Sequence, residues 1–188
     1  MTKIGITGSL ASGKTTASKI LSYKRGPLFC ADSVVKQLYK NKNFKSKLSK
    51  KFKVKNNNQI KSSIKKLIFK DKSNIKKLEK IVHPLVRKKM KNFALDNRNK
   101  KLLFFEIPLL IESKLMKFFD IIIFIKSQKK IRLNRFVAKQ NNKNLFHILN
   151  RKQMIESKKI KFCDYVVVND KNLKILKKNL SLIITKYE

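Results

Sequence analysis

The sequence predicts an α/β fold in which a five-stranded parallel sheet is flanked by helices. Short apolar runs alternate along the chain with segments of helical periodicity, which is the pattern of parallel strands joined by crossover helices. The apolar run within residues 119–125 is typical of a strand buried on both faces. A Lys- and Asn-rich region at residues 41–80 breaks the alternation and carries apolar residues at helical spacing, so we expect a helical insertion there.

Each expected strand is a short apolar run: Lys3–Thr7, Leu28–Ala31, Lys101–Glu106, Phe119–Ile125 and Tyr165–Asn169. Helices outside the insertion are expected where apolar residues recur at helical spacing: Thr16–Tyr23, Leu85–Leu95, Lys129–Lys139, Leu145–Lys159 and Leu173–Tyr187. Pro84 is expected to bend or restart the helix around it, and the polar stretch Gln140–Asn144 to form a loop. The resulting division is a core (1–35, 91–127 and 156–188), an insertion (36–90) and a small lid (128–155).

The composition suits one compact domain, because 188 residues with 42% hydrophobic content can bury a core. The net charge is +37, and only six of the 48 basic residues are arginine. Two interpretations stay open. One is a solvated lysine surface of the kind that an AT-rich genome would produce, and the other is a face that binds polyanions.

No apolar stretch reaches the roughly 18–20 residues of a membrane span, and the first residues lack the features of a signal peptide. Cys30 and Cys163 have no metal-type spacing, which favours reduced thiols that pack as small hydrophobic groups. We therefore expect a cytoplasmic protein, with a monomer favoured, no membrane partner and no specific nucleic-acid partner.

Residues 8–15, GSLASGKT, fit the pattern G-x-x-x-x-G-K-[ST] of the phosphate-binding loop, or P-loop. Gly8 and Gly13 permit backbone turns that a Cβ would obstruct, so that successive N–H groups point at phosphate oxygens. Lys14 adds a positive charge, and the Thr15 hydroxyl is a candidate Mg²⁺ ligand. Because a strand is expected before the loop and a helix after it, the sequence predicts a nucleotide-binding site.

Two further residues are candidates for chemistry. Asp32 stands at the carboxyl end of the second expected strand, where parallel sheets place ligands. It also precedes the helical segment 33–39, so Asp32 could act as a catalytic carboxylate, as the N-cap of that helix, or as both. His83, followed by Pro84, would by itself more often be a structural histidine than a site residue.

Phosphoryl transfer to a hydroxyl needs positioned phosphates, a divalent cation, a carboxylate near the acceptor and cations over the transferred group. Kinases of small molecules often supply those cations from a mobile lid. Arg132, Arg135 and Lys139 share one expected helix and fit such a lid. The alternative is an exposed, solvated basic helix.

Taken together, the chain resembles the dephospho-coenzyme A kinase family over nearly its full length. The matching segments stand in the family's order: Ile4–Gly8 leading into the P-loop, Ala31-Asp32, His83-Pro84, Pro108-Leu109-Leu110 with Glu112, the basic helix, Gln153, Lys159, and Cys163-Asp164 leading to Asn169. The His-Pro and Pro-Leu-Leu-x-Glu segments are more specific than the P-loop, which many families share.

The resemblance implies a P-loop kinase fold and transfer of the ATP γ-phosphate to the ribose 3′-hydroxyl of dephospho-coenzyme A, with Mg²⁺ as cofactor. It implies three catalytic residues: Asp32, Lys14 and Arg135. The implied ATP contacts are Gly8, Ala11, Ser12, Gly13, Lys14, Thr15, Thr16 and, near the adenine, Asn169. The implied acceptor-site residues are Asp32, His83, Pro108, Leu109 and Glu112, with the insertion holding the coenzyme A portion.

The chain departs from the family's usual pattern in several places. Cys30 stands where the first Asp of Asp-Ala-Asp is usual, which puts a metal role at that position in doubt. Ser9 and Ala11 replace P-loop glycines. Lys139 stands where a lid arginine is usual, and a lysine keeps the charge but cannot form the paired hydrogen bonds of a guanidinium group. Cys163 stands where an alanine is usual.

Two other functions are alternatives to this kinase. A nucleoside or nucleoside-monophosphate kinase would share the P-loop, but the His-Pro and Pro-Leu-Leu-x-Glu segments argue against it. A nucleic-acid-stimulated NTPase would explain the charge, but no recognisable nucleic-acid module supports it.

Overall fold

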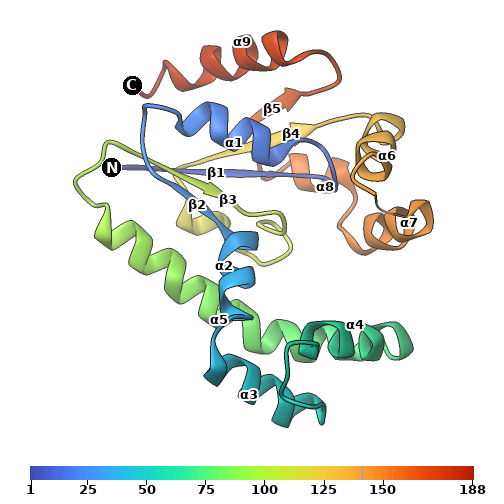
Figure 1. Ribbon diagram of the computed structural model, residues 1–188. Helices are drawn as coiled ribbons and strands as arrows, with labels where there is room; N and C mark the ends of the chain where they lie inside the picture. The colour runs from blue at the N-terminus through green and yellow to red at the C-terminus, as the bar shows by residue number, and fades with distance from the viewer. Residues whose placement is uncertain (141) are drawn as a thin grey trace. The chain divides into compact units, whose positions relative to one another are not determined.

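The computed structural model describes residues 1–140 and 142–188 (Figure 1). Asn141, which belongs to the expected loop Gln140–Asn144, lies outside the described residues. The chain divides into two compact units. The first comprises Met1–Cys30 with Asp96–Glu188, the second comprises Ala31–Leu95, and each is described by itself.

The first unit is built on a five-stranded sheet in which every pairing is parallel. Its strands are β1 (Thr2–Gly8), β2 (Leu28–Cys30), β3 (Leu102–Glu106), β4 (Ile121–Lys126) and β5 (Tyr165–Val168). The order across the sheet is β2-β3-β1-β4-β5, so β1 lies at the centre. The predicted five-stranded parallel sheet is therefore confirmed.

The helices of the first unit follow the strands: α1 (Lys14–Ser22), the 3₁₀ turn η1 (Met116–Phe118), α6 (Lys129–Val137), α7 (Lys143–Lys152), α8 (Glu156–Ile160) and α9 (Leu173–Ile184). One prediction was wrong here. The expected helix Leu145–Lys159 is two helices, because Gln153 adopts an extended backbone at the end of α7. Apolar periodicity continues across that break and does not reveal it.

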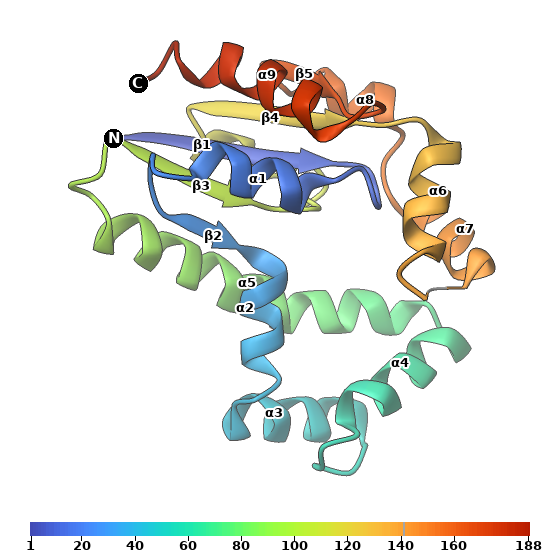
Figure 2. The same cartoon turned by 45° about the horizontal axis from the view of Figure 1, so that its top comes forward.

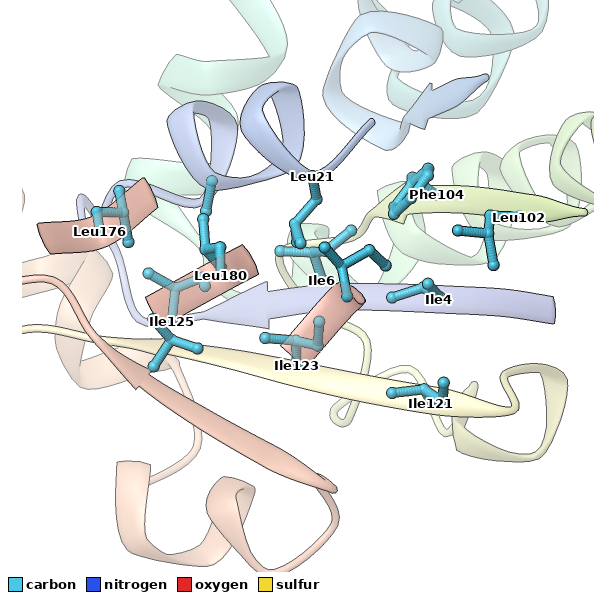
Figure 3. Packing of buried hydrophobic residues seen from close by; sticks show 13 residues of the cluster. Ile4, Ile6, Leu21, Leu102, Phe104, Ile121, Ile123, Ile125, Leu176 and Leu180 are labelled. Atoms are coloured by element: carbon cyan, nitrogen blue, oxygen red, sulfur yellow. The ribbon is translucent and has the colours of Figure 1, made fainter. Parts of the chain in front are cut away.

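Helices α1 and α9 lie on the same face of the sheet (Figures 1 and 2). Side chains from these helices and from four strands form one buried cluster between them, which Figure 3 shows from close by. Ile4 and Ile6 of β1, both fully buried, point into it beside Leu21 of α1 and Leu180 of α9. Alternate residues of a strand face opposite sides, so this apolar set anchors β1, which leads into the P-loop.

The other face of the sheet is covered by the segment between β3 and β4. A Cβ on Gly5 would lie 2.7 Å from Leu110 and 3.0 Å from Phe119, so any larger residue here would have to displace these side chains. Phe105 of β3 makes edge-on ring contacts with Phe118 and Phe119. This aromatic packing fixes the segment that follows Glu106.

The second unit is helical and consists of α2 (Ala31–Leu38), α3 (Lys42–Phe52), α4 (Ile60–Lys70) and most of α5 (Ser73–Asp96). Its core combines apolar residues from all four helices. Helix α5 runs without interruption through Pro84, so the expected restart of a helix at that proline was wrong. Of the helices in the described residues, none combines the length and the apolar character that crossing a membrane requires.

Candidate active site

The predicted P-loop joins the carboxyl end of β1 to the amino end of α1. Gly8 and Gly13 both have positive φ, +155° and +93°. A Cβ on Gly8 would lie 2.4 Å from the Ile125 carbonyl oxygen, and one on Gly13 would lie 2.2 Å from Asn169 Nδ2. Both glycines are therefore required by their surroundings as well as by their backbone conformation.

Lys14 is the first residue of α1 and is almost completely buried. Its Nζ donates to the carbonyl oxygens of Ser9, at 2.8 Å, and Gly8, at 3.2 Å. The ammonium group thus lies over the loop, where the backbone N–H groups of the α1 amino end also gather. Positive charge and a helix N-terminus together form a site for anions such as phosphates.

Thr15 directs its hydroxyl at a residue that lies outside the predicted site. Its Oγ1 donates to Glu106 Oε1 at 2.6 Å, and Glu106 is the last residue of β3. Strand β3 pairs with β1 in a register that sets Glu106 opposite Ile6, two residues before the P-loop. The only signal in the sequence was an acidic residue ending an apolar strand.

These two side chains fit a magnesium ion. A hydroxyl and a carboxylate are hard oxygen donors, which Mg²⁺ prefers, and Mg²⁺ commonly combines one or two such protein ligands with substrate phosphates and water. Glu106 is buried, and its Oε2 has no hydrogen-bond partner within the described part of the chain.

Arg132 on α6 holds the outer side of the P-loop. Its guanidinium donates to the carbonyl oxygens of Leu10, at 3.2 Å, and Ser127, at 3.0 Å, and to Asn150 Oδ1, at 2.8 Å. Burial lowers the pKa of Arg132, and the Glu156 carboxylate opposes that shift. The alternative of an exposed basic helix is therefore wrong for Arg132, whereas Lys139 at the end of this region is exposed.

Arg135 and Asn169 meet at the carbonyl oxygen of Ser12. Asn169 Nδ2 donates to that oxygen at 2.8 Å, and Arg135 lies 3.5 Å from it. Arg135 also contacts Ser127 Oγ at 3.3 Å. Asn169, which follows β5, is buried against Gly13, so two predicted site residues from distant parts of the chain lie beside the P-loop.

The segment that ends α7 and begins α8 also contacts the P-loop. Gln153 Oε1 accepts from the Leu10 amide at 3.0 Å, and Glu156 Oε2 accepts from the Ser9 hydroxyl at 2.7 Å. Gln153 belongs to the family pattern, but nothing in the sequence indicated its partner, and Glu156 was missed. Helix α7 ends at Lys152, and the extended Gln153 that follows directs its side chain to the loop.

The segment after β3 carries three of the predicted acceptor residues. The Pro108 carbonyl accepts from Thr7 Oγ1 at 3.2 Å, and Leu109 begins the turn that follows. Glu112 accepts from the Met154 amide at 3.2 Å, and its Oε1 lies 2.5 Å from Lys159 Nζ. All three are in the first unit with the P-loop.

Asp32 and His83 belong to the second unit. Asp32 is exposed and is the second residue of α2, so the N-cap alternative was wrong, since the helix already begins at Ala31. His83 is half-buried on α5 and lines an open depression of about 440 Å³. Its other lining residues are Lys76, Glu79, Lys80, Pro84 and Arg87, which make it basic.

The parallel sheet and the glycine-dependent loop with its buried lysine define this protein as a P-loop protein of the kinase fold. The structure resembles that of TT1252 from Thermus thermophilus, with a TM-score of 0.85, 26% identity, and coverage of 100% of this chain and 98% of the other. A dephospho-CoA kinase from Campylobacter jejuni gives a TM-score of 0.65 at 22% identity, covering 99% and 97% of the two chains, and supports the fold.

The family model described as dephospho-CoA kinase matches residues 2–174, and the chain belongs to this family. A relative of that name from Fusobacterium nucleatum subsp. nucleatum is 32% identical over 182 residues, which cover 94% of each chain. One from Rickettsia typhi is 32% identical over 189 residues, covering 100% of this chain and 98% of the relative. The match confirms the resemblance and does not favour a nucleoside or nucleoside-monophosphate kinase.

Proposed function

We propose that this chain transfers the γ-phosphate of ATP to the ribose 3′-hydroxyl of dephospho-CoA and thereby forms CoA and ADP. As a member of the dephospho-CoA kinase family it is a transferase that acts in CoA biosynthesis. The observation that carries the proposal is the buried Lys14 ammonium over the P-loop backbone, in a chain matched to that family over residues 2–174.

On the ATP side, residues 11–16 bind the phosphates through backbone N–H groups, with Gly8 as the hinge before them. Lys14 stabilises the charge that develops on the transferred phosphoryl group. Asn169 holds Gly13 and Ser12 in place and lines the adenine side of the site. The contact between Asn169 Nδ2 and the Ser12 carbonyl supports this role.

On the acceptor side, Asp32 orients the 3′-hydroxyl and accepts its proton as the oxygen attacks phosphorus. His83, Pro108, Leu109 and Glu112 line this part of the site. The helical region 36–90 holds the coenzyme A portion. The basic depression beside His83 supports that role, because coenzyme A carries several phosphate charges.

Residues 128–155 act as a lid that closes over the transferred group and excludes water. Arg135 supplies the cation nearest the reacting phosphate, and its contact with the P-loop carbonyl of Ser12 supports this assignment. Arg132 anchors the lid helix to the loop, and Lys139 adds charge at its outer end.

We assign Mg²⁺ to the Thr15 hydroxyl. When bound, the ion supplies charge neutralisation at the β- and γ-phosphate oxygens. The protein acts as a cytoplasmic monomer without a membrane or specific nucleic-acid partner. The lysine-rich surface attracts polyphosphorylated substrates by its long-range field.

A coupled assay of ADP release tests the proposal, with MgATP as donor and dephospho-CoA, nucleosides or nucleoside monophosphates as acceptors. Activity confined to dephospho-CoA is expected. Lys14→Ala and Asp32→Asn should abolish turnover while the circular-dichroism spectrum stays unchanged. Full activity of Asp32→Asn would remove the acceptor-side role of Asp32, and a preference for a nucleoside would overturn the substrate assignment.

A further inference from the structure

Residues 9–12, SLAS, form a tight turn in the outer part of the P-loop. The Ser12 amide donates to the Ser9 carbonyl oxygen at 3.2 Å, which closes the turn, and Lys14 Nζ donates to the same oxygen at 2.8 Å. Ala11, the third residue of the turn, has φ +58°. A positive φ at the third position favours glycine, because a Cβ disfavours that conformation. The turn therefore has a backbone conformation that its own sequence disfavours.

The alternative for such a turn is a flip of its central peptide unit, which joins Leu10 to Ala11. The two orientations of this unit keep the closing hydrogen bond, but φ of the third residue is about +80° in one and about −90° in the other. The orientation with negative φ suits an alanine. Contacts from outside the turn must therefore hold the central peptide unit in the orientation that the structure shows.

Two side chains supply these contacts, and both bind the backbone of Leu10. Arg132 of α6, which is 6% exposed, donates to the Leu10 carbonyl oxygen at 3.2 Å. That oxygen belongs to the central peptide unit, so a flip would break this hydrogen bond. Gln153 Oε1 accepts from the Leu10 amide at 3.0 Å and holds the preceding peptide unit. Both polar backbone groups of Leu10 are thus bound by side chains from distant parts of the chain.

The Arg132 guanidinium is itself fixed in place. It also donates to the Ser127 carbonyl oxygen at 3.0 Å and to Asn150 Oδ1 at 2.8 Å, and its Cζ lies 5.8 Å from the centroid of the Phe146 ring. A planar guanidinium group can serve several acceptors at once in a defined geometry, whereas the ammonium group of a lysine cannot. Arg132 is therefore a rigid support for the turn.

We propose that Arg132, assisted by Gln153, is a positioning residue that keeps the central peptide unit in the orientation that ATP binding needs. In a trans peptide unit the C=O and N–H groups point in opposite directions. Because the Leu10 C=O is directed outward to Arg132, the Ala11 N–H is directed to the inner side of the loop, with the amides that bind phosphate. A flip would turn a carbonyl oxygen towards the phosphates. This inference rests on the ATP binding proposed above.

The test compares Arg132→Lys in two backgrounds, with calorimetry as the measure of ATP affinity. With Ala11 in place, Arg132→Lys keeps the positive charge but loses the support, and it should weaken ATP binding about tenfold. In an Ala11→Gly background the positive φ carries little penalty, so the turn keeps its conformation unaided. Arg132→Lys should then weaken ATP binding by less than about threefold, because the two residues act on the same turn.

Arg98→Lys is the matched control, because it makes the same change at an exposed turn residue that precedes the amino end of β3. It should leave the ATP affinity unchanged in both backgrounds. Gln153→Ala gives a second comparison, which keeps the test valid if circular dichroism shows that Arg132→Lys folds poorly. It should weaken ATP binding with Ala11 in place, and less in the Ala11→Gly background.

Two results would overturn the inference. If Arg132→Lys and Gln153→Ala both bind ATP within about twofold of the wild type, neither side chain positions the loop. If each variant loses the same factor of affinity in both backgrounds, the loss does not arise from the turn at Ala11, as would be the case for an arginine that contacts ATP directly. If the wild-type protein does not bind ATP, the proposed function itself fails, and this result is separate from the comparison of variants.

Discussion

Lys159 Nζ lies 2.5 Å from Glu112 Oε1, and the lysine side chain is fully buried while the glutamate side chain is 19% exposed. This pair ties α8 to the segment that follows β3. Because α8 also begins with Glu156, which holds Ser9, the ion pair helps to fix the outer side of the P-loop.

Glu112→Gln should destabilise the protein by about 3 kcal/mol, because it leaves a fully buried ammonium group without its counter-charge. Lys159→Met should cost less, since Glu112 keeps partial contact with water and the Met154 amide. Urea denaturation measures both values. As a control, Glu188→Gln removes an exposed ion pair and should cost under about 1 kcal/mol. Equal losses for Glu112→Gln and Glu188→Gln would refute this account of the buried pair.

Arg132→Lys should lower stability by about 2 kcal/mol although it keeps the charge. One ammonium cannot reach three acceptors that belong to the P-loop, to Ser127 and to α7. The urea midpoint should fall, and amide exchange in α6 should speed up. The exposed Arg151→Lys is the control and should be neutral. An unchanged urea midpoint for Arg132→Lys would show that the three hydrogen bonds of the guanidinium group do not contribute to stability.

Ala11→Gly should stabilise the protein by up to about 1 kcal/mol. Ala11 has φ +58°, a left-handed conformation that costs an alanine about 1–2 kcal/mol. The added flexibility of the unfolded chain offsets about 0.4–1 kcal/mol of that gain. Ala138→Gly, at a right-handed position, should instead destabilise by about 0.5–1 kcal/mol. Thermal denaturation measures the change in stability of both variants. Changes of the same sign in the two variants would contradict the strain at Ala11.

The Cys163 thiol should be unreactive in the folded protein. Burial raises its pKa to about 12, with a further increase from Asp164 and an opposing effect of Lys159. In a Cys30→Ser background, iodoacetamide should label Cys163 slowly at pH 8 and at the rate of a free thiol in denaturant. Rapid labelling of the folded protein would show that the thiol is not protected.

The same pKa predicts a pH dependence of stability with a definite sign. Between about pH 9 and pH 12 the unfolded thiol loses its proton while the folded thiol keeps it. The contribution of the protonated Cys163 thiol to the free energy of unfolding is therefore fully present below pH 9 and is lost as the pH rises towards 12. The difference in urea midpoint between wild type and Cys163→Ala should shrink over this range, and a constant difference would contradict the raised pKa.

Much of the fold was predictable because its signals are local. Each strand is a short apolar run, and the P-loop glycines, Lys14 and Thr15 lie within eight consecutive residues. The helical character of residues 41–80 was likewise visible in the spacing of apolar residues. The division of the region 143–160 into α7 and α8 was not visible, since it depends on a contact between Gln153 and Leu10.

The class of fold, the phosphate-binding loop and the family could all be predicted from the order of residues along the chain. Which side chains surround that loop became known only from the folded structure. Glu106 meets Thr15 from 91 residues away, and Arg132 reaches Leu10 from 122 residues away. The reason is physical: periodicity and motif spacing report on neighbours along the chain, whereas the pairing of parallel strands brings distant residues to one edge of the sheet.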